Sequence, residues 1–97
     1  MIPEFLAAYV DHCQARRDGT FTDFDKVQAF GRAFATPDGQ TVLLELMRMA
    51  NVLRPVVVGD DATRAMAEGQ RALVHDILRY STADVDPNTK TVNYRIE

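Results

Sequence analysis

The chain has 97 residues, of which 46% are hydrophobic and 26% are charged, and its formal net charge is −3. This length is enough for one domain, and the composition excludes disorder along the whole chain. The acidic balance argues against a role dominated by nucleic-acid binding, which usually needs a basic face.

Residues 3–17 are predicted to form the first helix. Pro3 suits a first helical turn, because it brings no backbone donor and its φ angle is already helical. Asp18 and Gly19 then end the helix. Its apolar residues recur at helical spacing and form one stripe of Phe5, Leu6, Tyr9, Val10 and Cys13.

A second helix is predicted over about residues 23–34, with Thr22 or Asp23 as its N-cap. Gly31 lies inside this helix, where glycine costs up to about 1 kcal/mol relative to alanine. Its presence indicates either the close approach of a neighbouring helix or a tolerated defect.

The clearest local signal is the segment Thr36-Pro37-Asp38, which predicts the start of a third helix. The Thr36 hydroxyl can cap this helix, Pro37 fits its first position, and Asp38 meets the positive end of the helix dipole. The helix is expected to reach about residue 52. Its apolar residues cover a wide arc, so we expect it to lie at the centre of the core. These residues are Val42, Leu43, Leu46, Met47, Met49, Ala50 and Leu53.

Pro55 ends the third helix, because a residue before proline is pushed out of helical geometry. The β-prone run 56–58 follows, and a fourth helix is predicted over about residues 61–81, with Asp60 or Asp61 as its N-cap. The inner face of this helix is expected to carry Met66, Leu73, Ile77 and Tyr80.

The last segment, residues 82–97, changes from helical to strand-like. Val92, Tyr94 and Ile96 alternate with polar residues, which is the period-two pattern of a strand. No strong partner strand is visible within the tail, so its backbone would pair with a sheet on another protein, with a second copy, or with residues 56–58. A frayed terminus is the bland alternative.

The predicted fold is therefore mainly α. We expect a small bundle of about four helices in a domain of residues 1–81. Residues 82–97 are expected to form a C-terminal extended arm that is mobile in the monomer and ordered in an assembly.

Groups with catalytic chemistry are few. His12 and Cys13 are neighbours in sequence, as are His75 and Asp76, and adjacent residues on a helix point about 100° apart. Neither pair is therefore expected to act as a nucleophile with its base. The sequence also has no zinc, calcium, phosphate-loop or dinucleotide-binding motif. We expect no enzymatic activity, no catalytic residue, no cofactor and no metal site.

Cys13 is the only cysteine, which excludes an internal disulfide and suits a reducing compartment. The segment Met1–Glu4 lacks the basic start of a signal peptide. No stretch approaches the ~20 apolar residues that cross a bilayer, so no membrane partner is expected.

Two patterns bear on binding. Arg71 is within reach of Glu68 on its own helix, or of a carboxylate on a partner. The second and third helices resemble a helix-turn-helix, but the polar residues available to DNA, which include Glu45 and Arg48 beside Gln40 and Thr41, make a poor reading head. The candidate interface residues are Arg71, Glu68, Val92, Tyr94 and Ile96.

Two blocks of the sequence carry a family resemblance. The first is Phe34-Ala35-Thr36-Pro37-Asp38-Gly39, followed by Val42-Leu43 and Leu46, and the second is Glu68-Gly69-Gln70-Arg71, followed by Ile77-Leu78. Over about residues 34–78 the chain thus resembles a small phage protein family typified by a Bordetella phage member. It departs from the family at Gln40, Thr41 and Ala67.

The resemblance implies a phage or prophage source, and an association with the virion, because the family's genes tend to lie among virion structural genes. Together with the missing catalytic chemistry and the unpaired strand-like tail, the resemblance leads us to expect a non-enzymatic accessory protein that acts through protein–protein contacts in virion assembly or in the mature particle. The expected partners are other virion proteins or further copies of the chain, in the host cytoplasm, the virion or both. The alternative is a phage-encoded regulator or inhibitor of a host process, with or without DNA contact through the helix-turn-helix-like pair.

Overall fold

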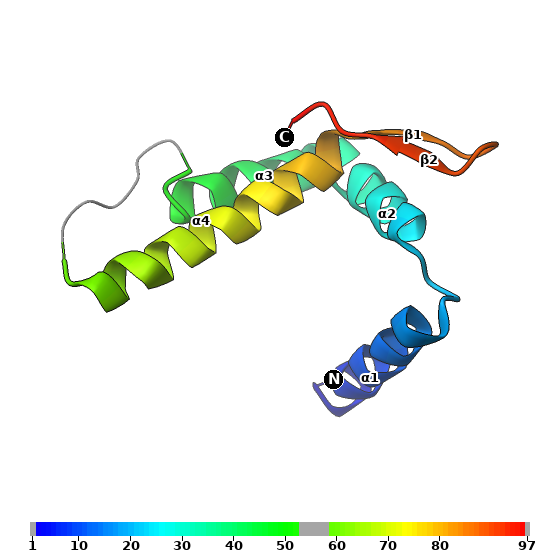
Figure 1. Ribbon diagram of the computed structural model, residues 1–97, viewed down its shortest axis with the longest axis horizontal. Helices are drawn as coiled ribbons and strands as arrows, with labels where there is room; N and C mark the ends of the chain where they lie inside the picture. The colour runs from blue at the N-terminus through cyan, green and yellow to red at the C-terminus, as the bar shows by residue number, and fades with distance from the viewer. Residues whose placement is uncertain (1, 53–58, 97) are drawn as a thin grey trace.

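The computed structural model describes residues 2–52 and 59–96, which form four helices and a β-hairpin (Figure 1). The helices are α1 (Ile2–Asp18), α2 (Asp23–Ala35), α3 (Pro37–Met49) and α4 (Asp61–Thr82), and the strands are β1 (Asp84–Asp86) and β2 (Thr91–Asn93). The prediction of a mainly α fold is confirmed. The run 56–58 lies outside the described residues.

Side chains cap the starts of α2, α3 and α4 at the residues that the sequence indicates. The Thr22 hydroxyl accepts the backbone N–H of Asp25 at 3.3 Å, and the Asp25 carboxylate accepts the N–H of Thr22 at 2.9 Å. Thr36 and Asp60 accept backbone N–H groups in the same way at the starts of α3 and α4. These bonds satisfy donors that helix geometry leaves without partners, so the local sequence sets where the helices begin.

The core forms where α2 packs against the C-terminal half of α4. Val27 of α2 is 1% exposed and Val74 of α4 is 7% exposed. Farther along the same contact, the rings of Phe30 and Tyr80 lie 5.3 Å apart, centroid to centroid. Burial of these apolar groups is the main force that holds the two helices together.

The prediction that the third helix lies at the centre of the core is wrong. α3 contains no buried residue, although Ala50, which directly follows it, is buried. α3 packs against α2 and α4, but side chains such as Val42 and Leu44 remain at least half exposed. Its wide apolar arc is covered only on the side that faces those two helices.

The C-terminal strand has its partner inside the tail, so the expectation that the tail offers none is wrong. β1 and β2 are antiparallel, with Val85 opposite Val92. The Asp86 side chain accepts the backbone N–H of Asn88 at 2.9 Å and stabilises the turn. β1 is too short and too polar to show an alternating pattern, which is why the sequence does not reveal it.

The hairpin packs on α2 and on the end of α4. The guanidinium of Arg79 lies 4.6 Å from the centroid of the Tyr94 ring, and its Nε donates to the carbonyl of Ile96 at 3.2 Å. Tyr94 also lies 6.3 Å from Tyr80, centroid to centroid. The tail is thus tied to the helices by specific side chains.

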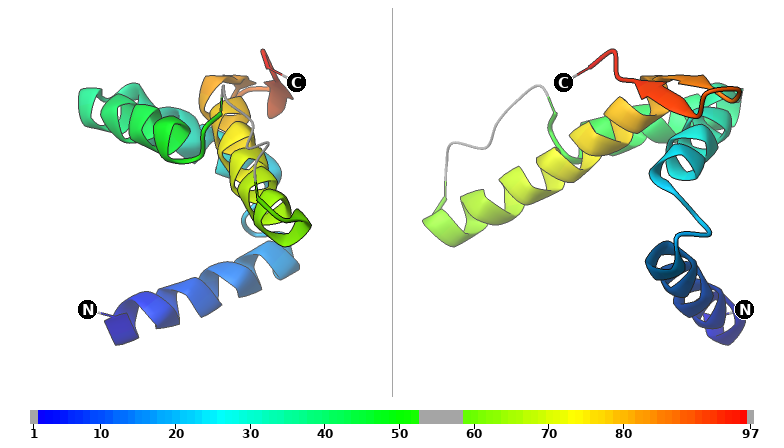
Figure 2. Two further views of the ribbon diagram at one scale, coloured as in Figure 1. Left: turned by 90° about the vertical axis from the view of Figure 1, so that its left-hand side faces the viewer. Right: turned by 45° about the vertical axis from the view of Figure 1, so that its right-hand side comes forward.

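α1 stands apart from the rest of the molecule (Figures 1 and 2). No helix or strand in the described part of the chain packs against it. Gly19, at a φ angle of 79°, turns the chain at its end. Arg16, on the last turn of α1, bonds to two residues beyond this turn of the chain: it donates to the Asp23 carboxylate at 2.6 Å and to the carbonyl of Phe21 at 3.3 Å. These contacts set the direction of α1 without covering its apolar stripe.

Candidate functional site

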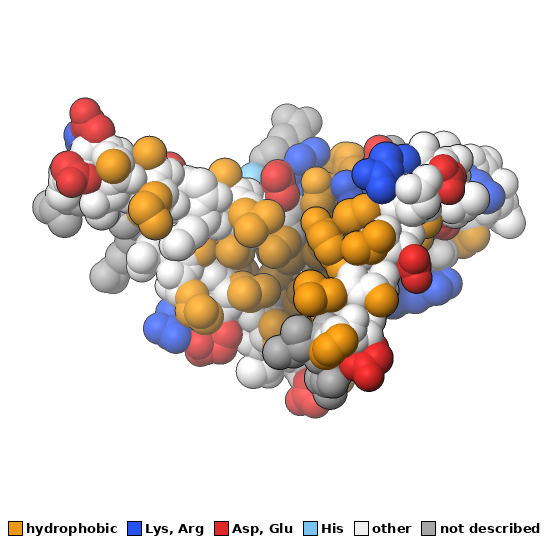
Figure 3. Space-filling view, turned by 90° about the horizontal axis from the view of Figure 1, so that it is seen from below, with side chains coloured by type: hydrophobic (Ala, Val, Ile, Leu, Met, Phe, Trp, Pro, Cys, Tyr) orange, Lys and Arg blue, Asp and Glu red, His pale blue; other side chains and the backbone are white. Residues whose placement is uncertain are grey.

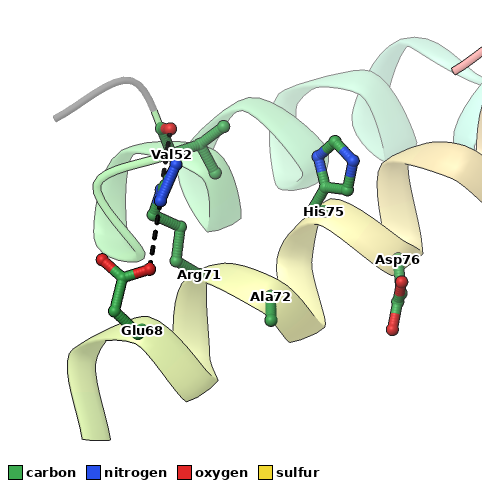
Figure 4. Close-up of a pocket in the computed structure, with 6 residues that line it drawn as sticks. All are labelled: Val52, Glu68, Arg71, Ala72, His75 and Asp76. Atoms are coloured by element: carbon green, nitrogen blue, oxygen red, sulfur yellow. Dashed lines mark hydrogen bonds and ion pairs between the residues drawn. The ribbon is translucent and has the colours of Figure 1, made fainter. Parts of the chain in front are cut away.

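A pocket of about 300 Å³ lies between α4 and the chain that follows α3. Figure 4 shows its lining residues, which are Val52, Glu68, Arg71, Ala72, His75 and Asp76. Arg71 connects two sides of this pocket, because its Nε donates to the carbonyl of Val52 at 3.1 Å and its Nη1 lies 3.1 Å from the Glu68 carboxylate. Of the two partners that the sequence left open for Arg71, the structure shows the one on its own helix.

His75 and Asp76 do not form an acid–base pair. They point to opposite sides of α4 (Figure 4), and the Asp76 carboxylate lies 3.6 Å from the guanidinium of Arg79. Within residues 2–52 and 59–96, no group of three or more His, Cys, Asp and Glu side chains is placed to hold a metal ion. With a carbonyl and a carboxylate as its partners, Arg71 ties α4 to the segment after α3.

A second hollow is apolar and lies between α3 and α4, with a volume of about 220 Å³. We call it the α3–α4 groove, and it is lined by Leu46, Met49, Ala50, Gln70, Leu73 and Val74. On its rim, Met49 is 64% exposed and Leu73 is 62% exposed. None of its described lining residues is charged, so it suits an apolar occupant.

This groove was not predicted, because Met66 and Leu73 were expected on the covered inner face of the fourth helix. They are 69% and 62% exposed, so the prediction is wrong at these two residues. A length comparison is the signal that would have found it. α4 has 22 residues and α2 has 13, so their lengths are roughly 33 Å and 20 Å. A stripe along the whole of α4 extends beyond its partner.

The apolar stripe of α1 is a third exposed feature. The four residues Phe5, Leu6, Tyr9 and Val10 are 58–75% exposed. Cys13 continues the stripe as a half-buried free thiol, and its hydrogen bond to the phenol raises the pKa of Tyr9. In the view from below, hydrophobic side chains gather on both sides of a hollow (Figure 3).

The five candidate interface residues fall into two separate groups. Arg71 and Glu68 lie on the middle of α4, beside the polar pocket. Val92, Tyr94 and Ile96 lie in the C-terminal hairpin and the chain after it. The hairpin group packs near Arg79, eight residues along α4 from Arg71, which corresponds to roughly 12 Å. The structure therefore does not join them into one surface.

The polar residues that the helix-turn-helix-like pair would present to DNA form hydrogen bonds mainly within their own helix. Arg48 donates to the Glu45 carboxylate at 2.8 Å and 3.1 Å. This contact raises the pKa of Arg48 and lowers that of Glu45. Thr41 donates its hydroxyl to the carbonyl of Pro37 at 3.2 Å. These side chains would have to leave their partners to reach base edges.

Comparison with known protein families shows which family the chain belongs to. Residues 30–91 match the model of the Bbp19-like phage protein family, which is more than half of the chain. The chain belongs to this family. The resemblance seen in the sequence over residues 34–78 is thereby confirmed, and Bbp19-like membership associates the chain with bacteriophages. No curated protein and no solved structure matches the chain.

The Bbp19-like region begins inside α2 and contains α3, α4 and β1. It therefore includes both the polar pocket and the α3–α4 groove, whereas α1 precedes it. No helix in the described residues has the length and hydropathy needed to span a membrane.

Proposed function

We propose that this Bbp19-like protein is a non-enzymatic phage accessory protein that acts through protein–protein contacts in virion assembly or in the mature particle. The observation that carries the proposal is the amount of apolar surface left uncovered. Within residues 2–52 and 59–96, ten large hydrophobic side chains are 40–75% exposed, whereas three hydrophobic residues are buried. Grouped apolar side chains on the surface of a small protein mark contact sites for other proteins.

The types of exposed side chain support the same proposal. Aromatic residues and methionine are enriched in the centres of protein interfaces, where charged residues are depleted. Phe5 and Tyr9 on α1, and Met49 and Met66 beside the α3–α4 groove, are of these types and are at least 63% exposed. Membership of a phage family supports a role in the phage cycle. The proposal adds that this role is in virion assembly or in the mature particle.

Mass spectrometry of purified phage particles tests this part directly. The particles are separated on a density gradient and washed at high salt, and the chain is quantified against the major capsid protein. A phage-encoded enzyme of the host cytoplasm, measured in the same samples, is the control for carry-over. We expect a constant ratio of this chain to capsid protein in virions or in assembly intermediates, and its absence from both would overturn the proposal.

A gel-shift assay at physiological salt separates the proposal from DNA-contacting regulation. Neutralised phosphate contacts make DNA binding fall steeply with salt concentration. We expect no such binding by this chain. Strong, salt-sensitive binding would favour a regulator that uses α2 and α3.

A further inference from the structure

We propose that two copies of the chain associate by exchanging α1, so that the apolar stripe of each α1 packs into the α3–α4 groove of the other copy. The observations that carry this inference are the uncovered stripe, the uncovered groove and the junction that keeps them apart within one chain. The inference goes beyond the proposed function and does not depend on it.

α1 needs a covering surface to be stable. It has 17 residues, and isolated helices of about this length are only marginally stable in water. In folded proteins such a helix gains most of its stability from packing of its apolar face. The stripe has no such contact within the described chain, and Phe5 is 75% exposed.

The junction between α1 and α2 holds α1 away from the groove of its own chain. The backbone N–H groups of Thr20 and Phe21 donate to the carbonyl of Ala15 at 3.1 Å and 3.2 Å, which forms a tight turn. The Phe21 ring also lies 4.7 Å from the His12 ring, and Arg16 is bonded to the start of α2. α1 is therefore held away from α3 and α4 (Figure 2), and the helix proposed to fill the groove is the α1 of another molecule.

The α3–α4 groove has the chemistry of a site for one amphipathic helix. Its walls come from two helices, and five of its six lining residues are apolar. Methionine side chains such as Met49 adapt their shape to an occupant. The α1 stripe presents Leu6, Tyr9, Val10 and Cys13 at the i, i+3, i+4 and i+7 positions, which is the spacing used when a helix binds in a groove. The described lining residues of the groove and the five residues of the stripe carry no charge.

The arrangement of the two surfaces favours a second copy as the occupant. The described part of each molecule has one stripe and one groove, and Figure 3 shows hydrophobic side chains on both sides of a hollow. One two-fold rotation can therefore seat both helices and leave no unfilled site, as in a closed isologous dimer.

The area of such an exchange reaches the lower limit for a specific interface. The stripe side of α1 is roughly 25 Å long and 10 Å wide, which corresponds to roughly 250 Å² on α1 and a matching area on the groove together with its exposed rim. Two contacts, each counted on both copies, bury roughly 1,000 Å², which is the smallest area expected of a specific interface and predicts a weak dimer.

Sedimentation equilibrium of the full chain over a range of concentrations tests the dimer. We expect Tyr9→Glu in the stripe and Leu73→Glu in the groove each to weaken dimerisation at least tenfold, because each places a charge in an apolar contact. Leu44→Glu is the matched control, since Leu44 is 65% exposed on α3 but does not line the groove. Circular dichroism of each variant checks that α2, α3 and α4 remain folded.

Mixing and cross-linking distinguish the exchange from a simple pairing of two α1 helices. The Tyr9→Glu copy retains an intact groove and the Leu73→Glu copy retains an intact stripe. An equal mixture can therefore form heterodimers with one intact contact, whereas a dimer of either variant alone has none, and we expect the mixture to dimerise more strongly than either variant. In a Gln70→Cys variant, a short bismaleimide is expected to join Cys13 of one copy to the introduced thiol of the other.

Three outcomes would overturn the proposal. The first is a chain that stays monomeric at every concentration. The second is a Leu44→Glu effect as large as that of Leu73→Glu. The third is cross-linking only between the two Cys13 residues, which would show that the α1 helices pair with each other.

Discussion

The ring of Phe30 on α2 lies 5.3 Å from the ring of Tyr80 on α4, at an interplanar angle of 56°. The same Tyr80 ring lies beneath the ammonium group of Lys26, 4.0 Å from its centroid, and 6.3 Å from the ring of Tyr94. A single side chain on the last turns of α4 therefore joins α2, α4 and the C-terminal tail.

Replacing Tyr80 by alanine should lower the free energy of unfolding by about 3 kcal/mol, because it removes all three ring contacts and leaves a cavity. Tyr80→Phe retains the ring and is the matched control, with an expected loss below about 1 kcal/mol. Urea denaturation followed by circular dichroism measures both. Equal losses in the two variants would mean that the hydroxyl, and not the ring, is the stabilising group.

Two valines test where the core lies. Val27 is 1% exposed and Val42 is 50% exposed. Val27→Ala should therefore cost about 2 kcal/mol of unfolding free energy, whereas Val42→Ala should change it by less than about 0.5 kcal/mol. Chemical denaturation of the two variants measures which of them loses more unfolding free energy. A larger loss in Val42→Ala would place the centre of the core at α3.

Gly39 and Gly69 should respond to alanine in opposite directions. A Cβ added at Gly39 would overlap the carbonyl oxygen of Ala33 and lie 2.9 Å from the Cα of Phe34, because only Thr36 separates the end of α2 from the start of α3. A Cβ added at Gly69 meets nothing within 4 Å. Gly39→Ala is expected to destabilise the protein and Gly69→Ala to stabilise it by about 0.5–1 kcal/mol. Thermal unfolding reports both signs, and stabilisation by Gly39→Ala would contradict the close approach.

The α4 cap should make stability depend on pH in acid. The Asp60 carboxylate accepts the N–H of Thr63 at 2.7 Å, and this backbone hydrogen bond lowers the pKa of Asp60. A lowered pKa in the folded state stabilises the protein above the ordinary pKa of the group, and that contribution is lost as pH falls below about 4. Asp60→Asn still caps the helix but does not titrate. The difference in urea midpoint between about pH 7 and pH 3 should therefore be smaller in this variant, and an unchanged difference would exclude the cap as a cause.

Deleting residues 88–97 should lower the thermal midpoint by roughly 5–10 °C, which corresponds to about 1–2 kcal/mol in a domain of this size. The deletion removes β2, the Tyr94 ring contacts and the carbonyl that Arg79 binds. Tyr94→Ala should produce part of the same loss. The helical circular dichroism signal at low temperature should persist, since none of the four helices is cut. An unchanged midpoint would restore the separable arm expected from the sequence.

The helix starts and the fold class were determined by the sequence alone, because they depend on groups close together in the chain. Thr22, Thr36 and Asp60 cap the helices that follow them through bonds to residues three positions ahead. Such bonds are available whatever the rest of the protein does. The Thr36-Pro37-Asp38 segment also lies in the block that resembles the phage family, so the same residues indicated the family.

Only the tertiary structure decided which apolar faces are covered. Leu73 and Val74 are neighbours on α4, yet one is 62% exposed and the other 7% exposed. Helical spacing placed Leu73 on the inner face of the helix, but exposure depends on where α2 crosses α4 and where it ends. β1 was hidden for a similar reason, since three residues with only Val85 apolar show no strand pattern until β2 lies beside them. The uncovered stripe and groove, which carry the proposed interactions, follow from the lengths and directions of whole helices, and these are set by contacts between distant parts of the chain.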